Sequence, residues 1–180
     1  ADVRDARARI LADDIVSDPL GCRGRFDVTR LRCTAAVSDG CLSDAQVRAV
    51  QTLQADLPFP VELANGLRSY PGRGPSAEAL PANGPTGGWM AWWTGASAPA
   101  FPPKPDNGIA WYYGAGAIQY FYAQNPDTDV RSYKPENHAA RVHEVSALMD
   151  STNPDLSSFR ARGGKLIVLE NLGDYAQSPY

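Results

Sequence analysis

Residues 153–174 read NPDLSSFRARGGKLIVLENLGD, and this stretch decides the fold class. Asn153-Pro154 is a typical helix start, with Asn as the cap and Pro at the first helical position. Gly163-Gly164 predicts that this helix ends in a left-handed turn. Lys165–Leu169 is then a continuous apolar run, which predicts a strand buried on both faces, as in a parallel sheet.

Asp174 follows this predicted strand after a short loop. Functional groups of open α/β sheets gather at the carboxyl ends of the strands, so Asp174 is a candidate catalytic acid. The simpler alternative is that it is only a loop or cap residue. One helix–strand unit cannot make a parallel sheet, so the 180 residues are predicted to be a piece of a larger α/β protein. In this interpretation a mostly irregular and helical insertion precedes the return to the sheet.

Two further long helices are predicted upstream, and between them a short helix around Ile118, Phe121 and Tyr122 that ends before Pro126. The first covers residues 43–57, where Ser43 and Gln46 form a capping box, and the second covers 135–149, with Pro135 in its first turn. Residues 58–110 hold most of the Pro and Gly and predict irregular structure. The buried faces are predicted to be Val47, Val50, Leu53 and Leu57 in the first helix, and Val142, Val145, Leu148 and Met149 in the second.

Composition excludes several classes of protein. The chain is 43% hydrophobic and 21% charged, which is typical of a globular unit and not of a disordered chain. Its net charge of -3 gives no bulk attraction to nucleic acid or to an anionic membrane. No apolar run approaches the roughly 20 residues that a membrane span needs.

The three cysteines predict one local disulfide. Cys33 and Cys41 flank a seven-residue loop, which an oxidising compartment would allow to be closed. The rival interpretation is a metal site, but there is no CxxC, and the two histidines, His138 and His143, are far away in the sequence. Cys22 is left unpaired. A structural disulfide predicts a secreted or periplasmic location.

The stretch Asn153–Ile167 resembles the most recognisable part of the tannase and feruloyl esterase family, which includes mono(2-hydroxyethyl) terephthalate hydrolase. The resemblance runs from about Asp5 to Tyr180. It is also carried by Cys41–Val47, by Asp18-Pro19 with Cys22, and by Trp89–Gly95.

The resemblance implies an α/β-hydrolase whose large lid domain is inserted before the strand that bears the catalytic acid. Residues 1–150 would then be a loop-rich, helical lid. Residues 151–180 would be the helix, buried parallel strand and loop that re-enter the hydrolase core.

The reaction implied by the resemblance is serine ester hydrolysis, and Asp174 lies where the family places its acid. The triad of α/β-hydrolases follows the chain order Ser, Asp, His. No G-x-S-x-G occurs in the sequence, and no His follows Asp174. His138 and His143 are predicted to be solvated or to pack on a helix. The 180 residues alone are therefore predicted to be inactive.

The family's lid also carries a calcium site, just before the Asp-Pro at residues 18–19. The family's three aspartates fall on Ala6, Arg9 and Asp13, so Asp13 is the one carboxylate retained in the degenerate region 5–19. Calcium needs several oxygen ligands. We therefore expect no tightly held calcium and no other cofactor. The family cysteine that would pair with Cys22 falls on Asp5.

The substrate implied by the resemblance is an ester of an aromatic acid, such as a gallate, ferulate or terephthalate monoester. Aromatic lid residues could stack on the acid, although each could equally belong to the lid core. The candidates are Trp89, Trp92, Trp93, Trp111 and Tyr120, with Tyr112 and Phe121 beside them.

Two other interpretations remain open from the sequence. In one, the chain is a non-catalytic module that binds aromatic or carbohydrate ligands through its Trp-rich loops. In the other, it is a lid subunit complemented by a separate hydrolase chain. The reading frame on either side of residues 1 and 180 would distinguish them.

Overall fold

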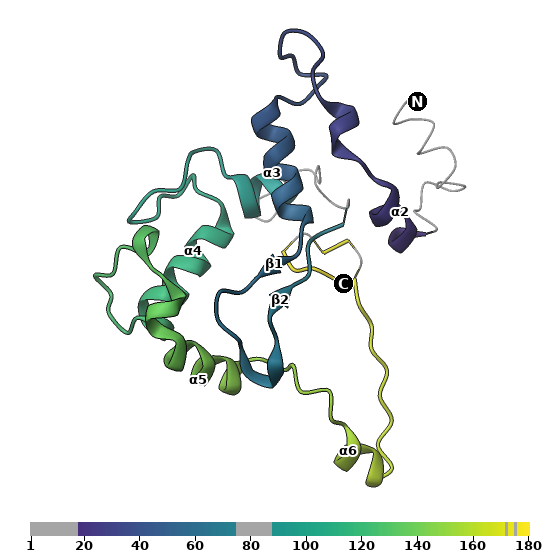
Figure 1. Cartoon of the computed structure of the whole chain (residues 1–180), viewed down its shortest axis with the longest axis vertical. Coiled ribbons are helices and arrows are strands. Elements are labelled where there is room, and N and C mark those ends of the chain that lie inside the picture. The colour runs from purple at the N-terminus through teal and green to yellow at the C-terminus, as the bar shows by residue number, and fades with distance from the viewer. Residues whose placement is uncertain (1–17, 75–87, 172, 175) are drawn as a thin grey trace. The chain divides into compact units, whose positions relative to one another are not determined.

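The computed structural model describes residues 18–74, 88–171, 173, 174 and 176–180 (Figure 1). These residues divide into two compact units, each built from segments that are distant in the sequence. No helix in the described ranges has the length and apolar character needed to cross a membrane.

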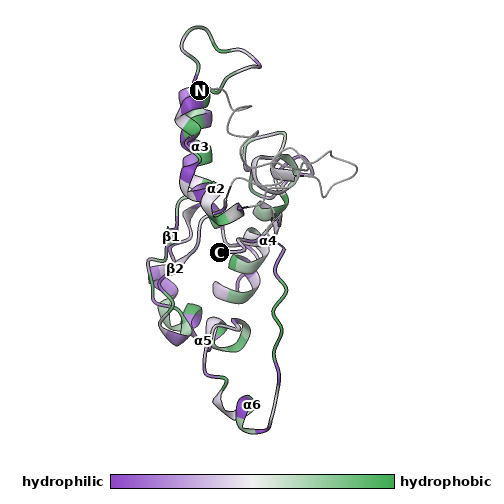
Figure 2. Ribbon diagram, turned by 90° about the vertical axis from the view of Figure 1, so that its right-hand side faces the viewer, coloured by the Kyte–Doolittle hydropathy of each residue, from purple (hydrophilic) through white to green (hydrophobic). Residues whose placement is uncertain are grey.

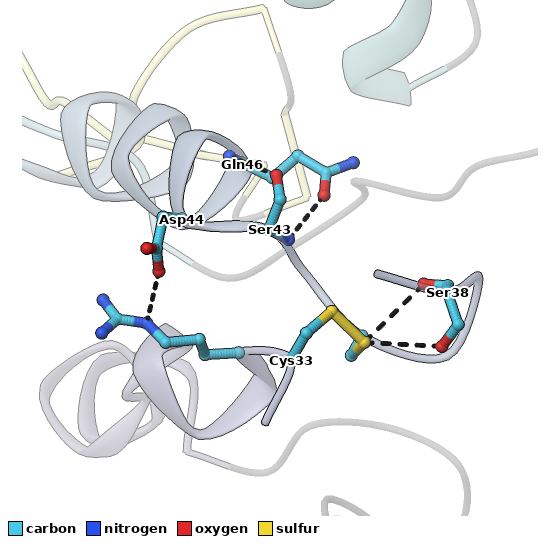
Figure 3. Close-up of a disulfide and its surroundings, with 7 residues drawn as sticks. Cys33, Ser38, Ser43, Asp44 and Gln46 are labelled. Atoms are coloured by element: carbon cyan, nitrogen blue, oxygen red, sulfur yellow. Dashed lines mark hydrogen bonds and ion pairs between the residues drawn. A yellow bond between two sulfur atoms is a disulfide. The ribbon is translucent and has the colours of Figure 1, made fainter. Parts of the chain in front are cut away.

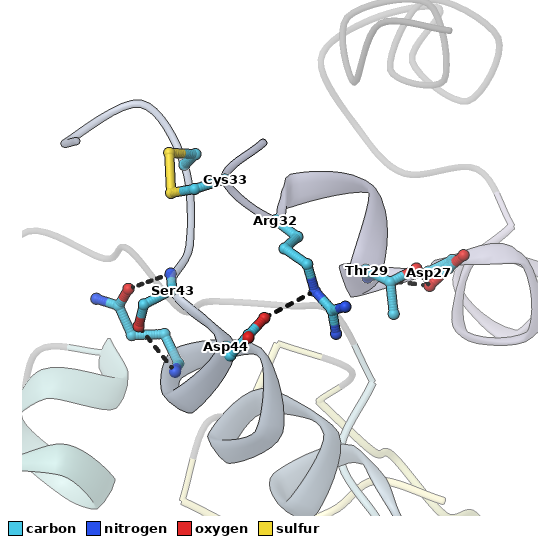
Figure 4. Close-up of polar contacts among 8 residues, drawn as sticks. Asp27, Thr29, Arg32, Cys33, Ser43 and Asp44 are labelled. Carbon is cyan, nitrogen blue, oxygen red and sulfur yellow. Dashed lines mark hydrogen bonds and ion pairs between the residues drawn. A yellow bond between two sulfur atoms is a disulfide. The ribbon is translucent and has the colours of Figure 1, made fainter. Parts of the chain in front are cut away.

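The first unit contains residues 18–56, 71–74 and 173–180. Its short helix α2, Pro19–Arg25, begins at Asp18, whose carboxylate accepts a hydrogen bond from the amide of Gly21 at 2.8 Å. The 3-10 turn η1, Val28–Leu31, begins in the same way at Asp27 (Figure 4).

Helix α3, Asp44–Gln54, follows with the predicted capping box. The Ser43 amide donates to the Gln46 side chain at 2.8 Å, and the Gln46 amide donates to the Ser43 hydroxyl. Val47 is fully buried, as predicted, but the helix ends three residues before Leu57, which is exposed. Leu57 precedes Pro58, and the proline ring disfavours helical backbone at the residue before it.

The disulfide Cys33–Cys41 closes the loop between η1 and α3, at the positions that the sequence predicts (Figure 3). Two backbone hydrogen bonds join the chain segments on either side of this loop. Cys33 N–H donates to the carbonyl of Leu42 at 2.9 Å, and Leu42 N–H donates to the carbonyl of Leu31 at 2.8 Å. Cys22 is a free thiol.

The second unit contains residues 57–70 and 88–171. Its strands β1, Leu57–Pro58, and β2, Ser69–Tyr70, form a two-residue antiparallel ladder. The 3-10 turn η2, Ala64–Gly66, lies in the connection between them and packs against helix α5.

The predicted helix over 135–149 is present as the 3-10 turn η6, Pro135–His138, followed by α5, Ala139–Met149. Val142 and Val145 are buried as predicted, whereas Leu148 and Met149 are exposed, so that half of the predicted face is wrong. The packed face runs through Val142, Val145 and Ser146. Leu148 therefore lies off it, and Met149 lies at its end.

A helical region of the second unit carries eight of the 17 aromatic residues of the chain. It comprises the π-helical turn η3, Met90–Thr94, then α4, Ile109–Gly116, which continues into the π-helical turn η4, Ala117–Tyr122. The sequence predicts only the short helix near Phe121, because the glycines and aromatic residues of α4 have low helix propensity. The 3-10 turn η5, Val130–Ser132, follows.

The last helix, α6, covers Ser157–Ala161 and begins later than the Asn153 cap predicts. Asn153 instead accepts a hydrogen bond from the amide of Asp155, and Asp155 accepts one from the amide of Ser157. The helix ends as predicted at Gly163, whose φ of 77° lies in the left-handed region.

The segment predicted as a buried parallel strand, Lys165–Leu169, forms no strand with the described residues. The segment is extended and exposed, with 93% of Ile167 and 96% of Leu169 accessible to solvent. It is the hydrophobic stretch that follows α6 in Figure 2. No described residue pairs with it as a neighbouring strand, so its backbone does not join a sheet.

Candidate functional site

The carboxylate of Asp174 is half-buried and held by its own loop. Its Oδ1 accepts hydrogen bonds from the backbone amides of Ala176 at 2.7 Å and Gln177 at 3.1 Å. Among the described residues, none donates a hydrogen bond to Oδ2. The backbone amides of its own loop therefore fix the orientation of the Asp174 carboxylate.

A distant segment supports this loop within the first unit. The Arg73 guanidinium donates from Nη2 to the carbonyl of Ala176 at 3.0 Å. In the opposite direction, the Ser178 hydroxyl donates to the carbonyl of Gly72 at 2.9 Å. Sequence reasoning missed both contacts because Arg73 lies in a Pro- and Gly-rich stretch that predicts only a turn.

The C-terminal residue Tyr180 lies against the same unit. The Arg23 guanidinium lies 4.2 Å from the centre of its ring, a cation–π contact. Gly74 permits the close approach, because a Cβ atom there would lie 2.3 Å from the Tyr180 hydroxyl. Burial raises the pKa of the Tyr180 phenol above its ordinary value.

The aromatic candidates lie in the second unit and fall into two kinds. Trp89 is buried, and the indole N–H of Trp111 donates to the carbonyl of Ala100 at 2.7 Å, so both serve the packing of the unit. Trp92 and Trp93 are half-buried, and Trp92 stacks on Tyr113 with ring centres 5.7 Å apart. Tyr120 is 65% exposed and accessible to a ligand.

Asn107 organises the loop between η3 and α4. It is 5% exposed, and four of its hydrogen bonds join it to that loop. Its Oδ1 accepts from the amides of Ala100 and Lys104, and its Nδ2 donates to the Ser97 hydroxyl and the Ala98 carbonyl. These bonds use the full hydrogen-bonding capacity of an amide side chain. No sequence signal singles out Asn107.

The two histidines take no part in these arrangements. His138 stacks on Tyr133 with ring centres 5.0 Å apart, and His143 is exposed on α5. In the ranges that the structure describes, no cluster of three His, Cys, Asp or Glu side chains could hold a metal ion. Asp13 and the rest of the region 5–17 lie outside the described residues.

Comparison with known families gives one match that spans residues 2–180, to the family described as tannase and feruloyl esterase. An uncharacterized esterase of Xanthomonas campestris pv. campestris is 36% identical over 167 residues, which cover 87% of this chain and 26% of that protein. A protein of Aspergillus clavatus named "Probable feruloyl esterase B" is 26% identical over 162 residues, which cover 90% of this chain and 26% of that protein.

Among solved structures, feruloyl esterase B from Aspergillus oryzae is similar, with a TM-score of 0.56 and 23% sequence identity. The match covers 85% of this chain and 26% of that one. At this level of identity the likeness shows a shared fold. The chain thus spans about a quarter of the length of the relatives it matches.

Proposed function

The chain belongs to the tannase and feruloyl esterase family, and we propose that it supplies the lid and the triad acid of a serine esterase. The proposed substrates are esters of aromatic acids, such as gallate, ferulate or terephthalate monoesters. The observation that carries the proposal is the carboxylate of Asp174, with Oδ1 fixed by two backbone amides. Its second oxygen would accept the Nδ1 proton of a catalytic histidine.

In this mechanism a serine hydroxyl attacks the ester carbonyl, and the histidine takes its proton. Asp174 would hold the imidazole in the tautomer that accepts this proton and would stabilise the imidazolium that forms. The sequence contains no G-x-S-x-G and no histidine after Asp174. We therefore propose that the serine and the histidine come from segments of the same polypeptide outside residues 1–180.

The exposed segment Lys165–Leu169 supports a place in a larger hydrolase core. Its four apolar side chains are between 60% and 96% exposed. Full burial of one large aliphatic side chain stabilises a protein by about 1.5–3 kcal/mol. We propose that this segment becomes a buried strand when the rest of the parallel sheet is present, with Asp174 just beyond its carboxyl end.

The lid would recognise the aromatic acid through the accessible members of its aromatic set. Tyr120 is exposed, and the rings of Trp92 and Tyr113 present a stacked pair. Offset stacking on a phenolic ring stabilises such complexes by about 0.5–1.5 kcal/mol beyond the area buried. The disulfide supports a secreted or periplasmic location for the enzyme.

The test compares residues 1–180 with the complete polypeptide that contains them, using methyl ferulate and methyl gallate. The proposal predicts turnover by the complete polypeptide and none by residues 1–180. If the complete polypeptide is inactive while residues 1–180 bind a phenolic acid or an oligosaccharide, the chain is a binding module. If turnover requires a second gene product, the chain is a separate lid subunit.

A further inference from the structure

Two hydrogen bonds running in opposite directions fix the backbone that follows Asp174. The Arg73 side chain donates to the Ala176 carbonyl, and the Ser178 side chain donates to the Gly72 carbonyl. The partners are separated by 103 and 106 residues in the sequence. Local structure alone therefore does not set the position of this loop. Residues 72 and 73, which belong to the proposed lid part of the sequence, also hold it by hydrogen bonds.

Ala176 is held at both of its backbone polar groups. Its amide donates to Asp174 Oδ1 at 2.7 Å, and its carbonyl accepts from Arg73 at 3.0 Å. The second bond has a charged donor, which makes it stronger than a bond between neutral groups. A shift of the Ala176 carbonyl would also move the amide that orients the Asp174 carboxylate.

Arg73 is itself anchored on the end of helix α3. Its backbone N–H donates to the carbonyl of Leu53 at 3.0 Å, in the last turn of the helix. The preceding amide, that of Gly72, donates to the carboxylate of Asp56 at 2.9 Å. Arg23 binds the same carboxylate oxygen at 3.2 Å. The guanidinium therefore extends from a backbone that a regular helix holds in place.

We propose that Arg73 is a positioning residue for the triad acid. This inference rests on the proposed function, in which Asp174 orients the catalytic histidine. Arg73 acts through Ala176 and makes no contact with the substrate. An error of about 1 Å in the position of a catalytic group can cost about 100-fold in rate, so loss of the Arg73 hydrogen bond should be visible in turnover.

The experiment measures kcat, KM and the pH profile of kcat/KM in the complete esterase with methyl ferulate. Arg73→Met keeps the length of the side chain and removes the donor, whereas Arg73→Lys restores a cationic donor. Arg68→Met is the matched control, because Arg68 pairs with Glu62 on the surface and is 76% exposed. Ser178→Ala removes the reciprocal hydrogen bond with the loss of one oxygen atom, and circular dichroism checks the folding of each variant.

For Arg73→Met we expect kcat to fall about 10- to 100-fold with KM nearly unchanged. The acid limb of the kcat/KM profile should move to lower pH by about one unit, since a displaced carboxylate stabilises the imidazolium less. Arg73→Lys should recover most of the loss, Ser178→Ala should shift the limb in the same direction, and Arg68→Met should match the wild type.

Three outcomes overturn the inference. One is a folded Arg73→Met enzyme with kcat within threefold of wild type and an unmoved acid limb. If Arg73→Met fails to fold, an unmoved limb in Ser178→Ala overturns it instead. If Asp174→Asn retains its turnover, the proposed function fails and the inference fails with it. If Asp174→Asn is inactive while Arg73→Met has the wild-type kcat and pH profile, the inference is refuted and the proposed function stands.

Discussion

Replacing Asn107 by alanine should destabilise the second unit severely. The side chain makes four hydrogen bonds at distances of 2.9 to 3.2 Å, all within the loop that leads into α4. Each bond stabilises the folded state by about 0.5–1.5 kcal/mol, and a buried group left without its partner costs about 1–3 kcal/mol. The amides of Ala100 and Lys104 would both lose their acceptor. We therefore expect the free energy of unfolding to fall by about 3–5 kcal/mol, a large part of the stability of a typical domain.

Urea unfolding followed by tryptophan fluorescence measures this effect selectively. All four tryptophans, at positions 89, 92, 93 and 111, belong to the second unit. Asn125→Ala is the matched control, because Asn125 is exposed and its side-chain oxygen accepts a hydrogen bond from the amide of Asp127. This variant should lose less than about 1 kcal/mol. An Asn107→Ala loss as small as that of the control would refute the role assigned to Asn107.

Three further predictions concern the disulfide, calcium and high pH. Cys33→Ser with Cys41→Ser should lower the free energy of unfolding by about 2–3 kcal/mol, and non-reducing peptide mapping should find Cys22 alone as a thiol; a link from Cys22 to either cysteine would contradict this. Calorimetric titration with calcium should show no sub-millimolar binding, whereas binding that disappears in Asp13→Ala would show that a site exists. Burial, and next the charge of Asp150, raise the pKa of Tyr122 above its ordinary value. The contribution of the Tyr122 phenol to stability is therefore complete below about pH 10 and is lost as the pH rises through the folded pKa. Between neutral pH and pH 11 the free energy of unfolding in urea should therefore fall less for Tyr122→Phe than for the wild type, and an equal fall in both proteins would contradict this.

Features set by neighbouring residues could be predicted from the sequence. The capping box of Ser43 and Gln46, and the left-handed turn at Gly163, depend on a few adjacent residues, and both are present. The family could also be recognised, because its most specific stretch lies between Asn153 and Ile167. Features that depend on residues close together in the sequence can therefore be predicted from a single sequence.

Features set by distant partners could not be predicted. Arg73 meets Ala176 across 103 residues, and nothing near Arg73 in the sequence indicates that contact. The hydrogen bonds of Asn107 lie within its own loop, but the backbone of that loop is irregular. No sequence motif comparable to a helix cap predicts such a backbone. The apolar run at Lys165–Leu169 also depends on distant partners: its composition predicts burial, but burial requires neighbouring strands that the described residues do not provide.

The central claim is that Asp174 is the triad acid, and the turnover of Asp174→Asn in the complete esterase tests it most directly. Replacement of such an acid by its amide leaves the geometry in place but supports the wrong histidine tautomer, at a cost of about 10⁴ in kcat. Circular dichroism must show the variant to be folded, and Arg68→Met, at a surface residue that is 76% exposed, serves as the control with near-normal turnover. We predict a loss of about 10⁴ in kcat on methyl ferulate or methyl gallate. A folded Asp174→Asn enzyme that keeps more than about a tenth of the wild-type kcat, far above the loss expected for a triad acid, would contradict the account.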